Sequence, residues 1–357
     1  MTENSRETSR PGPIGNDTAA TDTSAASHSF PALLTVSPSP HLRARDTTAT
    51  LMLDVLIALL PANIWGIYLF GTRALWQILI CTAVAILTEG LWELLLHREI
   101  TVNDGSAAVT GVLLAMNLPV SLPLWMGALG AVFAVLVVQQ LFGGIGKNIM
   151  NPALSARVFL CLSFTGSMTR FPAAYDRLWF SAADCVASAT PLASLKAGQL
   201  PEASLLDVIF GRTGGCIGEV SALLLLIGGI YLICRKVISW RIPVSYLGTV
   251  ALLALLFPRV PDARLSCVVY ELCSGGLFLG AFFMATDYVT SPVTKGGRIV
   301  FGIGCGALTV FIRTFGGYPE GVSFSILIMN SLVWYLDRAF RPRVFGSSRT
   351  GKGTVES

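Results

Sequence analysis

Charged residues are scarce in this sequence. Only 13% of its 357 residues are Asp, Glu, Lys or Arg, whereas 53% are hydrophobic. Soluble domains carry charge on about a quarter of their residues, so this composition excludes an ordinary soluble protein and indicates an integral membrane protein. The net charge is only +4, and the basic residues are scattered at the ends of apolar runs. Because no basic patch is present in the sequence, nucleic-acid binding is excluded.

Metal-binding patterns are also missing. The eight cysteines form no CxxC pair and lie mostly inside apolar runs, where cysteine behaves as a small hydrophobic residue. The sequence therefore predicts neither a zinc site nor an iron–sulfur cluster. His28, His41 and His97 lie outside the apolar runs, which argues against a histidine-ligated haem in the membrane. We predict no metal ligands.

Two other motifs are incomplete. The stretch GGIGKN, Gly143 to Asn148, has the glycines of a phosphate-binding loop without the GxxxxGK[ST] spacing. We interpret it as a tight turn after a span, where glycine permits positive φ and close helix approach. The first 46 residues are rich in Ser, Thr, Pro and Ala and lack the apolar core of a secretory signal. They are predicted to be a disordered tail.

Long apolar runs, by contrast, are abundant. A membrane helix needs about 20 apolar residues, and the sequence contains ten candidate spans, several of them short or interrupted. Interrupted spans belong inside a bundle, where protein or water satisfies the freed backbone groups. The candidates are 50–70, 75–96, 105–118, 122–142, 150–165, 217–234, 243–257, 268–286, 298–313 and 321–338.

The distribution of basic residues predicts the orientation of these spans. Ten spans place both termini on one side, and most Lys and Arg residues fall on that side, which is therefore predicted to be cytoplasmic. The opposite loops contain mainly Arg73, Arg259, Arg264 and Arg313. The predicted organisation is a cytoplasmic tail (1–46), a first five-helix repeat (47–165), an extracytoplasmic loop (166–216), a second five-helix repeat (217–340) and a cytoplasmic C-terminal tail (341–357).

The two halves of the chain resemble each other. TGVLLAMN, followed later by QLFGGIGKN, matches LGAFFMATD, followed later by RTFGGYPEG, at a spacing of roughly 170 residues. Five spans in each half force the second half to enter the membrane from the other side. The predicted fold is thus an all-α integral membrane protein of about ten transmembrane helices in two inverted five-helix repeats, with a pathway at their interface.

Six ionisable residues fall within or at the ends of apolar runs. Each costs a few kcal/mol when exposed to lipid, so these residues are expected to face the bundle interior, to pair, or to lie at the membrane interface. Glu89 and Glu93 share one helix face, and Glu89 is our candidate for a residue that lines an ion pathway. The six are Asp54, Glu89, Glu93, Arg157, Glu219 and Glu271.

The longest polar interruption contains the stretch DCVASATPLASLKAG, Asp184 to Gly198. Pro191 disfavours the helical conformation at Thr190, so that this residue is expected to be extended with an accessible hydroxyl. Ser188 and Ala189 add little bulk, which suits a segment presented to a modifying enzyme. A short Ser-Ala-Thr motif before proline is common, and a plain surface turn explains it equally well.

Five blocks of the sequence resemble one specific family. The chain is similar to the RnfD family, the D subunits of the Rnf ion-translocating ferredoxin:NAD oxidoreductase complexes, and more distantly to the B subunits of the sodium-translocating NADH:quinone reductases. The resemblance extends from about Leu51 to Gly346. The blocks are GGIGKNIMNPALSARVFL, SATPLASLKAG, GGCIGEVSALLLLIGGIYLICRKVISWRIP, GAFFMATDYVTSPVTKGGRIVFG, and RTFGGYPEGVSFSILIMN with the closing RPRVFG.

This resemblance implies a covalent flavin. The family attaches FMN through a phosphoester bond to the threonine of a D-x-x-[ST]-[GS]-A-T motif, in a reaction carried out by a separate flavin transferase. The matching residues here are Asp184, Ser188, Ala189 and the acceptor Thr190, whereas Ala187 departs from the usual Ser or Thr. A threonine hydroxyl supplies the nucleophile that such a transfer requires. Arg170, Arg177 and Lys196 are candidates to pair with the phosphate, or are solvated loop charges.

The resemblance also implies the setting of this flavin. Some relatives hold a second, non-covalent flavin such as riboflavin. Expected partners are iron–sulfur and NADH-binding subunits, a second subunit with covalent FMN, two small membrane subunits, the flavin transferase and membrane lipid. The chain has no cluster motif and no dinucleotide-binding fingerprint of its own, so it is expected to be a relay without catalytic residues, in the cytoplasmic (inner) membrane.

Two alternatives remain open at the level of sequence. Within the same class, the chain could be the B subunit of a sodium-translocating NADH:quinone reductase. From another class, it could be a flavin-free solute transporter, because inverted five-helix repeats also form transport pathways. A transporter would not need the Thr190 segment.

Overall fold

The computed structural model describes residues 47–98, 101–172, 190–219, 221–260, 263–317 and 320–341. These residues form helices and connecting loops. Strands are absent from these ranges, in which an isolated bridge joins Pro119 to Cys216. An all-helical chain with several apolar helices fits an integral membrane protein, because helices satisfy their own backbone hydrogen bonds in lipid.

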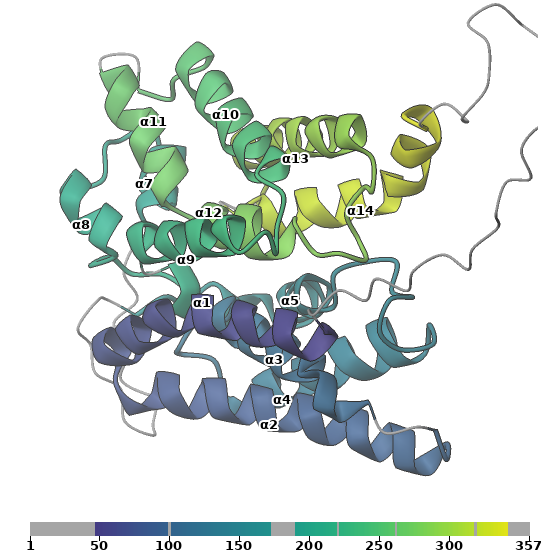
Figure 1. The fold of residues 1–357 in the computed structure, drawn as a ribbon. Helices are drawn as coiled ribbons and strands as arrows, with labels where there is room; N and C mark the ends of the chain where they lie inside the picture. The colour runs from purple at the N-terminus through teal and green to yellow at the C-terminus, as the bar shows by residue number, and fades with distance from the viewer. Residues whose placement is uncertain are drawn as a thin grey trace, which may run out of the picture. The chain divides into compact units, whose positions relative to one another are not determined.

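The first half of the helical unit contains two long helices followed by shorter ones (Figure 1). Gly71, at φ 80°, separates the two long helices, and Asn151 caps α5 by accepting a hydrogen bond from the Leu154 amide. Pro152 occupies the first turn of α5, where its missing N–H leaves no donor unpaired. The elements are α1 (Thr48–Phe70), α2 (Thr72–Leu95), η1 (Val102–Asp104), α3 (Ser106–Met116), α4 (Leu124–Val132), its π-helical continuation η2 (Phe133–Gln140), α5 (Pro152–Ser163) and α6 (Thr165–Met168).

The remaining elements are two short helices, α7 and α8, followed by the second half of the bundle. Its third span is broken: α11 and the continuous pair α12 and η5 are bent by 58° relative to each other. The elements are α7 (Pro191–Lys196), α8 (Leu205–Phe210), η3 (Ile217–Glu219), α9 (Ala222–Cys234), α10 (Arg241–Leu256), α11 (Arg264–Cys273), α12 (Leu277–Leu279), η5 (Gly280–Met284), α13 (Lys295–Phe315) and α14 (Val322–Ala339).

Each of the ten predicted apolar runs contains a helix or a bent helix pair. By length and composition, however, three described helices suffice to cross a membrane, namely α1, α2 and α13, and the bent pair would be a fourth. Five other apolar helices have only 10–17 residues. The number of membrane crossings and the inverted repeat therefore stay predictions.

The two halves meet where α1 packs against α9 (Figure 1). A Cβ atom on Gly228 of α9 would lie 2.4 Å from the carbonyl oxygen of Ala58 on α1, so only glycine permits this approach. A second contact between the halves joins α5 to α14.

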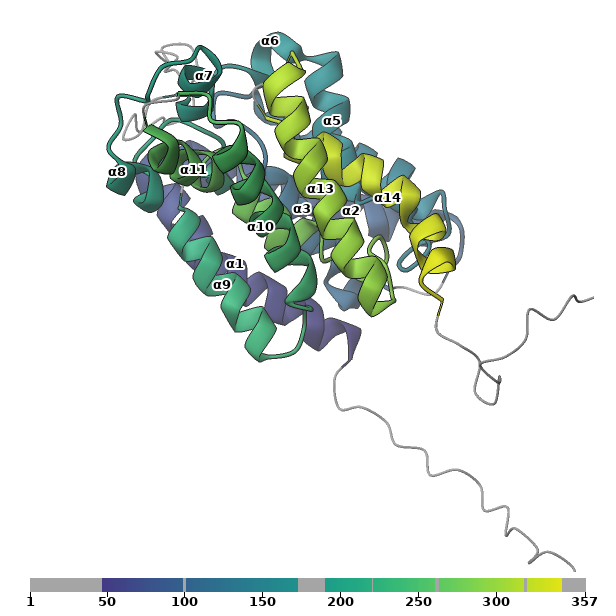
Figure 2. The ribbon, with the colours of Figure 1, turned by 90° about the horizontal axis from the view of Figure 1, so that it is seen from above.

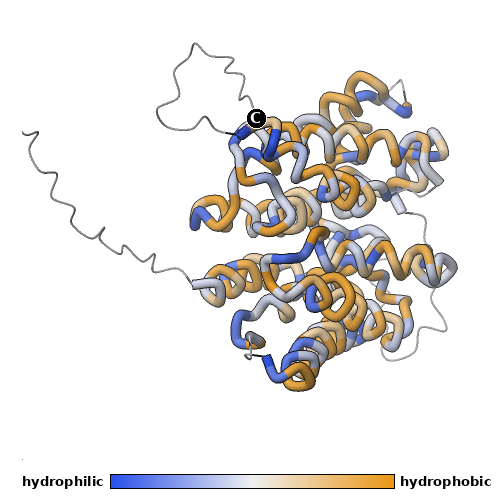
Figure 3. Tube along the Cα trace, turned by 90° about the vertical axis from the view of Figure 1, so that its right-hand side faces the viewer, coloured by the Kyte–Doolittle hydropathy of each residue, from blue (hydrophilic) through white to orange (hydrophobic). Residues whose placement is uncertain are grey.

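Polarity is distributed as expected for a protein surrounded by lipid. Figure 3 shows hydrophobic residues along most of the helices. On α1, large apolar side chains are exposed along one face, whereas Asp54 is buried and accepts hydrogen bonds from Tyr231 and Arg235 of the α9 region. Glu93 is likewise buried and binds Thr101. Pairing inside the bundle removes the cost of exposing these carboxylates to lipid. The exposed residues on α1 are Leu53, Ile57, Leu60, Ile64 and Tyr68.

The short helices gather at one end of the bundle. Figure 2 shows α6, α7 and α8 at this end, whereas α1 begins and α14 ends toward the opposite end. The described part of the polar interruption thus lies away from both helical termini.

Candidate functional site

Thr190 is the residue that begins helix α7. Its backbone is extended, at φ −72° and ψ 150°, as the following proline predicts. Its hydroxyl oxygen accepts a hydrogen bond from the Ala193 amide at 3.3 Å, which makes Thr190 the N-cap of α7. The residue is only 8% exposed. The expectation of an accessible hydroxyl is therefore wrong in this conformation, because the cap draws the side chain onto the helix.

Helix α7 is held by apolar packing and by its C-terminal lysine. Leu192 and Leu195 are buried in a small apolar cluster with Val208 and Tyr270. At the C-terminal end of α7, the Lys196 ammonium donates to the carbonyl oxygens of Gly316 and Gly317, at 2.5 and 3.0 Å. Lys196, a candidate partner for a phosphate, thus binds the end of α13 in this structure.

The remaining motif residues are not placed by the structure. Asp184, Ala187, Ser188, Ala189 and Arg177 lie outside the described residues. The carbonyl oxygen of Arg170 accepts a hydrogen bond from Ser121 at 2.5 Å. The candidate flavin site is therefore represented by Thr190 and its surroundings.

Thr190 lines a small cavity together with two carboxylates, which we call the Thr190 pocket. Glu219 is the last residue of η3, and Glu320 lies two residues before the start of α14. The open volume is about 10 Å³, room for about one water molecule. A group as large as a flavin ring would lie outside this hollow. The pocket is lined by Thr190, Pro191, Leu192, Thr213, Gly214, Gly215, Glu219, Cys273, Ser274, Gly275 and Glu320.

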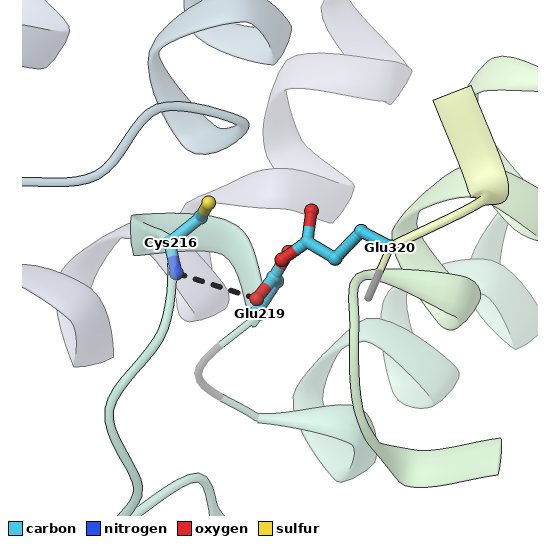
Figure 4. A group of neighbouring side chains, drawn as sticks. All are labelled: Cys216, Glu219 and Glu320. Atoms are coloured by element: carbon cyan, nitrogen blue, oxygen red, sulfur yellow. Dashed lines mark hydrogen bonds between the residues drawn. The ribbon is translucent and has the colours of Figure 1, made fainter. Parts of the chain in front are cut away.

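Both carboxylates belong to a buried ionic cluster centred on Arg157. The Arg157 guanidinium binds Glu320 directly, lies 3.5 Å from Glu219 and donates to the Asn117 side chain at 2.9 Å. Figure 4 shows the carboxylates of Glu219 and Glu320 pointing toward each other, with Cys216 beside them. Arg157 comes from α5 and Glu320 precedes α14, so the cluster joins the two halves of the chain.

The cluster has a donor set that resembles a metal site. Cys216 Sγ and one carboxylate oxygen each from Glu219 and Glu320 lie within 4.8 Å of one another. Arg157, however, already binds these atoms, with its Nη2 atom 3.7 Å from the sulfur of Cys216. Burial raises the pKa of the Cys216 thiol well above its ordinary value, which keeps it protonated and a poor metal ligand. The arrangement is that of an ion-pair network.

A backbone break borders the same pocket. Gly275 and Gly276 have φ values of 72° and 62° and separate α11 from α12. Arg313, which is fully buried, donates to the carbonyl oxygens of Glu271 and Ser274 at 2.7 and 3.0 Å and to the Glu271 carboxylate. It thereby satisfies carbonyl groups that the end of α11 leaves without helical partners.

In the first half, a buried arginine likewise binds backbone carbonyl groups. Arg73 of α2 donates to the carbonyl oxygens of Val120 and Leu122 at 2.8 and 2.9 Å, in the loop between α3 and α4. Arg73 and Arg313 are two of the few basic residues of the predicted outer loops. Both are buried, so they bind backbone instead of solvent.

Glu89, the candidate for an ion pathway, faces the bundle interior. It is 1% exposed, and its Oε1 atom accepts from the side chains of Gln139 and Gln140 at 3.3 and 3.1 Å. Its other oxygen has no hydrogen-bond partner among the described residues. The structure thus places a buried carboxylate there, and its role in an ion pathway stays a prediction.

Some residues of the site are not found by sequence reasoning. Glu320 and Ser274 lie outside the expected set of membrane charges, and Gly275 is one of 35 glycines. Glu219 and Arg157 are recognisable as membrane charges, but their pairing joins segments about 60 residues apart. No periodic pattern predicts that contact.

The fold and the site define a helical membrane protein whose halves are joined by a buried ion-pair network. A family model described as the NQR2, RnfD, RnfE family matches residues 35–346. The chain belongs to this family.

Similar proteins cover most of the chain. The D subunit of the Na⁺-translocating ferredoxin:NAD⁺ oxidoreductase complex of Acetobacterium woodii is 51% identical over 89% of this chain and 97% of its own length. The D subunit of the proton-translocating ferredoxin:NAD⁺ oxidoreductase complex of Clostridium ljungdahlii is 41% identical over 89% and 97%. The D subunit of an ion-translocating oxidoreductase complex of Stutzerimonas stutzeri is 40% identical over 87% and 96%. The resemblance to the D subunits of Rnf complexes is confirmed.

Proposed function

We propose that this chain is the membrane-embedded D subunit of an Rnf-type ferredoxin:NAD oxidoreductase, and that it carries FMN on Thr190. It would relay electrons within a complex that moves Na⁺ or H⁺. The observation that best supports the proposal is the match of five sequence blocks and of nearly full-length relatives that are subunits of such complexes. The names of these relatives differ in the ion, so the family leaves the coupling ion open.

The surroundings of Thr190 fit the attachment of a phosphoester. Esterification would leave the Oγ1 atom with lone pairs, so it could still accept the hydrogen bond from Ala193 that caps α7. The Thr190 pocket has room for about one water molecule, so an attached phosphate and flavin would lie outside the hollow. Transfer requires the side chain to turn outward, at the cost of about 1 kcal/mol for a lost cap.

Bound FMN would accept electrons singly or in pairs and so link one-electron centres to two-electron carriers. The chain's own part is to hold the tether at one end of the bundle. Leu192 and Leu195 anchor α7, and the Arg157 network fixes the segments around it. Iron–sulfur, NADH-binding, second covalent-FMN and small membrane subunits are the proposed partners, with a flavin transferase for maturation. A second, non-covalent flavin such as riboflavin would appear in the extract of acid-denatured protein.

We further propose ten spans in two inverted repeats, in the cytoplasmic (inner) membrane, with both termini cytoplasmic and the Thr190 end outside. In a variant without native cysteines, Gln199→Cys, which is exposed beside α7, would then react with an impermeant thiol reagent in intact cells. A variant that keeps only Cys234, which is exposed at the end of α9, is the matched control and would react only in inverted vesicles. The opposite labelling pattern would overturn this topology.

The flavin assignment is tested by fluorescence of the denatured chain on a gel after co-expression with a flavin transferase. Thr190→Ser keeps both the hydroxyl and the cap, whereas Thr190→Asn keeps the cap but has no hydroxyl. We expect wild type and Thr190→Ser to fluoresce and Thr190→Asn to be dark. A dark wild-type band would favour the flavin-free transporter, and a fluorescent Thr190→Asn would move the attachment elsewhere. Oxidation of NADH with quinone as the electron acceptor would favour the NADH:quinone reductase alternative.

A further inference from the structure

A basic cavity lies where the end of α9, the start of α10 and the segment before α13 meet. Its volume is about 380 Å³. Three cationic side chains, Lys236, Arg241 and Arg298, line it, and no Asp or Glu is among its lining residues. The cavity is large enough for a small anionic group, because ligand pockets begin at about 300 Å³.

Hydrogen bonds and stacking hold these cations in place without an acidic partner among the described residues. None of the three takes part in an ion pair within the described part of the chain. Arg298 Nε donates to the Pro292 carbonyl at 2.9 Å, and the Arg241 guanidinium stacks on Trp240 at 5.4 Å from the ring centroid. These contacts orient the two guanidinium groups without supplying a negative charge.

Three carboxylates have hydrogen-bond partners on segments that adjoin the cavity. Asp337 accepts hydrogen bonds from the Val293 and Thr294 amides, and Asp287 accepts one from Thr290. Asp54 is paired with Arg235, one residue before Lys236. Three cations thus lie near two carboxylates, Asp287 and Asp337, that form no ion pair among the described residues, and the net charge of this region is positive.

Helix α10 adds to this charge. It has 16 residues, and no side chain caps its N-terminus at Trp240. Arg241 and Ile242, in its first turn, line the cavity. The first amides of a helix lack helical partners and attract anions, so the start of α10 strengthens the field of the three cations.

The rim of the cavity indicates where the anion comes from. Trp240 and Val293, which line the cavity, are 54% and 75% exposed, and Val244, one turn after Trp240 on α10, is 57% exposed. Tryptophan beside basic residues is typical of the membrane interface, where apolar surface contacts acyl chains and cations contact headgroups. A soluble anion would make no use of this apolar rim.

We propose that the basic cavity binds the phosphate-bearing headgroup of an anionic phospholipid, with its acyl chains against Val244 and Val293. This binding does not depend on the flavin or on electron transfer. It would hold the α9–α10 loop and the start of α13 together through a lipid.

The test uses the full chain in its purified complex, reconstituted in phosphatidylcholine vesicles with spin-labelled phosphatidylglycerol or spin-labelled phosphatidylcholine. We expect wild type to retain the anionic label preferentially. Removing one charge should lower that preference roughly fivefold, in Lys236→Gln, Arg241→Gln or Arg298→Gln. Arg298→Lys keeps the charge and should keep the preference. Inorganic phosphate should compete with the label in detergent.

Arg338→Gln is the matched control. Arg338 stacks on Trp334 at 5.5 Å near the end of α14, which makes it a second Arg–Trp pair outside the basic cavity. It should leave the lipid preference unchanged. An equal loss in Arg338→Gln would reduce the effect to general surface charge and overturn the proposal. Binding of inorganic phosphate without any lipid preference would contradict the assignment to lipid, as would a wild-type protein that prefers neither lipid.

Discussion

Leu192, two residues after the proposed flavin acceptor, packs directly on Gly275 at the break between α11 and α12. A Cβ atom on Gly275 would lie 2.1 Å from Leu192 Cδ1. The segment that holds Thr190 and the broken helix of the second half are thus fitted to each other at a single position. A change in the backbone at Gly275 would therefore shift Leu192 and with it the start of α7, where Thr190 lies.

Gly275→Ala should displace α7 and lower stability by about 2–4 kcal/mol, because it combines a left-handed backbone with a steric clash. Gly198→Ala is the matched control: its φ is also positive, at 77°, but a Cβ there meets nothing within 4 Å. It should cost about 1 kcal/mol. Thermal unfolding of the purified protein measures both.

A double variant separates the clash from the backbone strain. The double variant Leu192→Ala/Gly275→Ala should lose less stability than the sum of the two single variants, because Leu192→Ala removes the atom that the new methyl group meets. Simple additivity of the two substitutions would contradict the packing described here.

Removal of Arg157 should be strongly destabilising. Arg157→Gln leaves Glu219 and Glu320 facing each other without their cation, and breaking a buried pair in this way costs about 3–5 kcal/mol. Adding Glu320→Gln should recover part of the loss. Arg235→Gln breaks the pair with Asp54, in which the arginine side chain is 53% exposed, so it should cost only about 1 kcal/mol or less. Equal effects of Arg157→Gln and Arg235→Gln on the unfolding temperature would refute this ranking.

Arg313→Lys should not be tolerated as a conservative change. The guanidinium of Arg313 reaches Glu271 and Ser274 with two nitrogen atoms, and an ammonium cannot reproduce this fork. We expect a loss of about 2–3 kcal/mol, from carbonyl groups and a carboxylate left unpaired. Lys295→Arg, at the exposed start of α13, should be neutral. A neutral Arg313→Lys in the same unfolding assay would contradict the proposed capping role.

Cys216 should resist alkylation in the folded protein. Burial raises the pKa of its thiol, so the reactive thiolate forms only at a pH well above the ordinary range for cysteine. Raising the pH from 7 to 9 should therefore leave Cys216 unmodified, whereas the exposed Cys234 reacts. Peptide mass spectrometry after treatment with N-ethylmaleimide distinguishes the two residues. Labelling of Cys216 at the rate of Cys234 would show that the ionic cluster is open to solvent.

The helices are predictable because hydrophobic length is a local property of the sequence. Each apolar run from 50–70 to 321–338 contains a helix, and Pro191 correctly predicts the extended backbone at Thr190. The break at Gly275 is not predictable in this way, because the glycines of an apolar run give no indication of which one lies against Leu192. The burial of Thr190 also escapes sequence reasoning, since it depends on how α7 packs.

The ionic cluster shows the same limit. Arg157 and Glu219 can be identified as charges that need partners, but Glu320 is 163 residues from Arg157 along the chain. Contacts at such separations depend on the tertiary arrangement of α5 and α14. The proposed role of Thr190, in turn, comes from family resemblance and not from its local pattern.

The most direct test of the central claim is mass spectrometry of the tryptic peptide that extends from residue 178 to residue 196. It contains Ser181, Ser188, Thr190 and Ser194, so fragment ions distinguish the four hydroxyl groups. The proposed function predicts one FMN, joined by a phosphoester, on Thr190 in protein matured with its flavin transferase. An unmodified peptide, or FMN on one of the three serines, would contradict it.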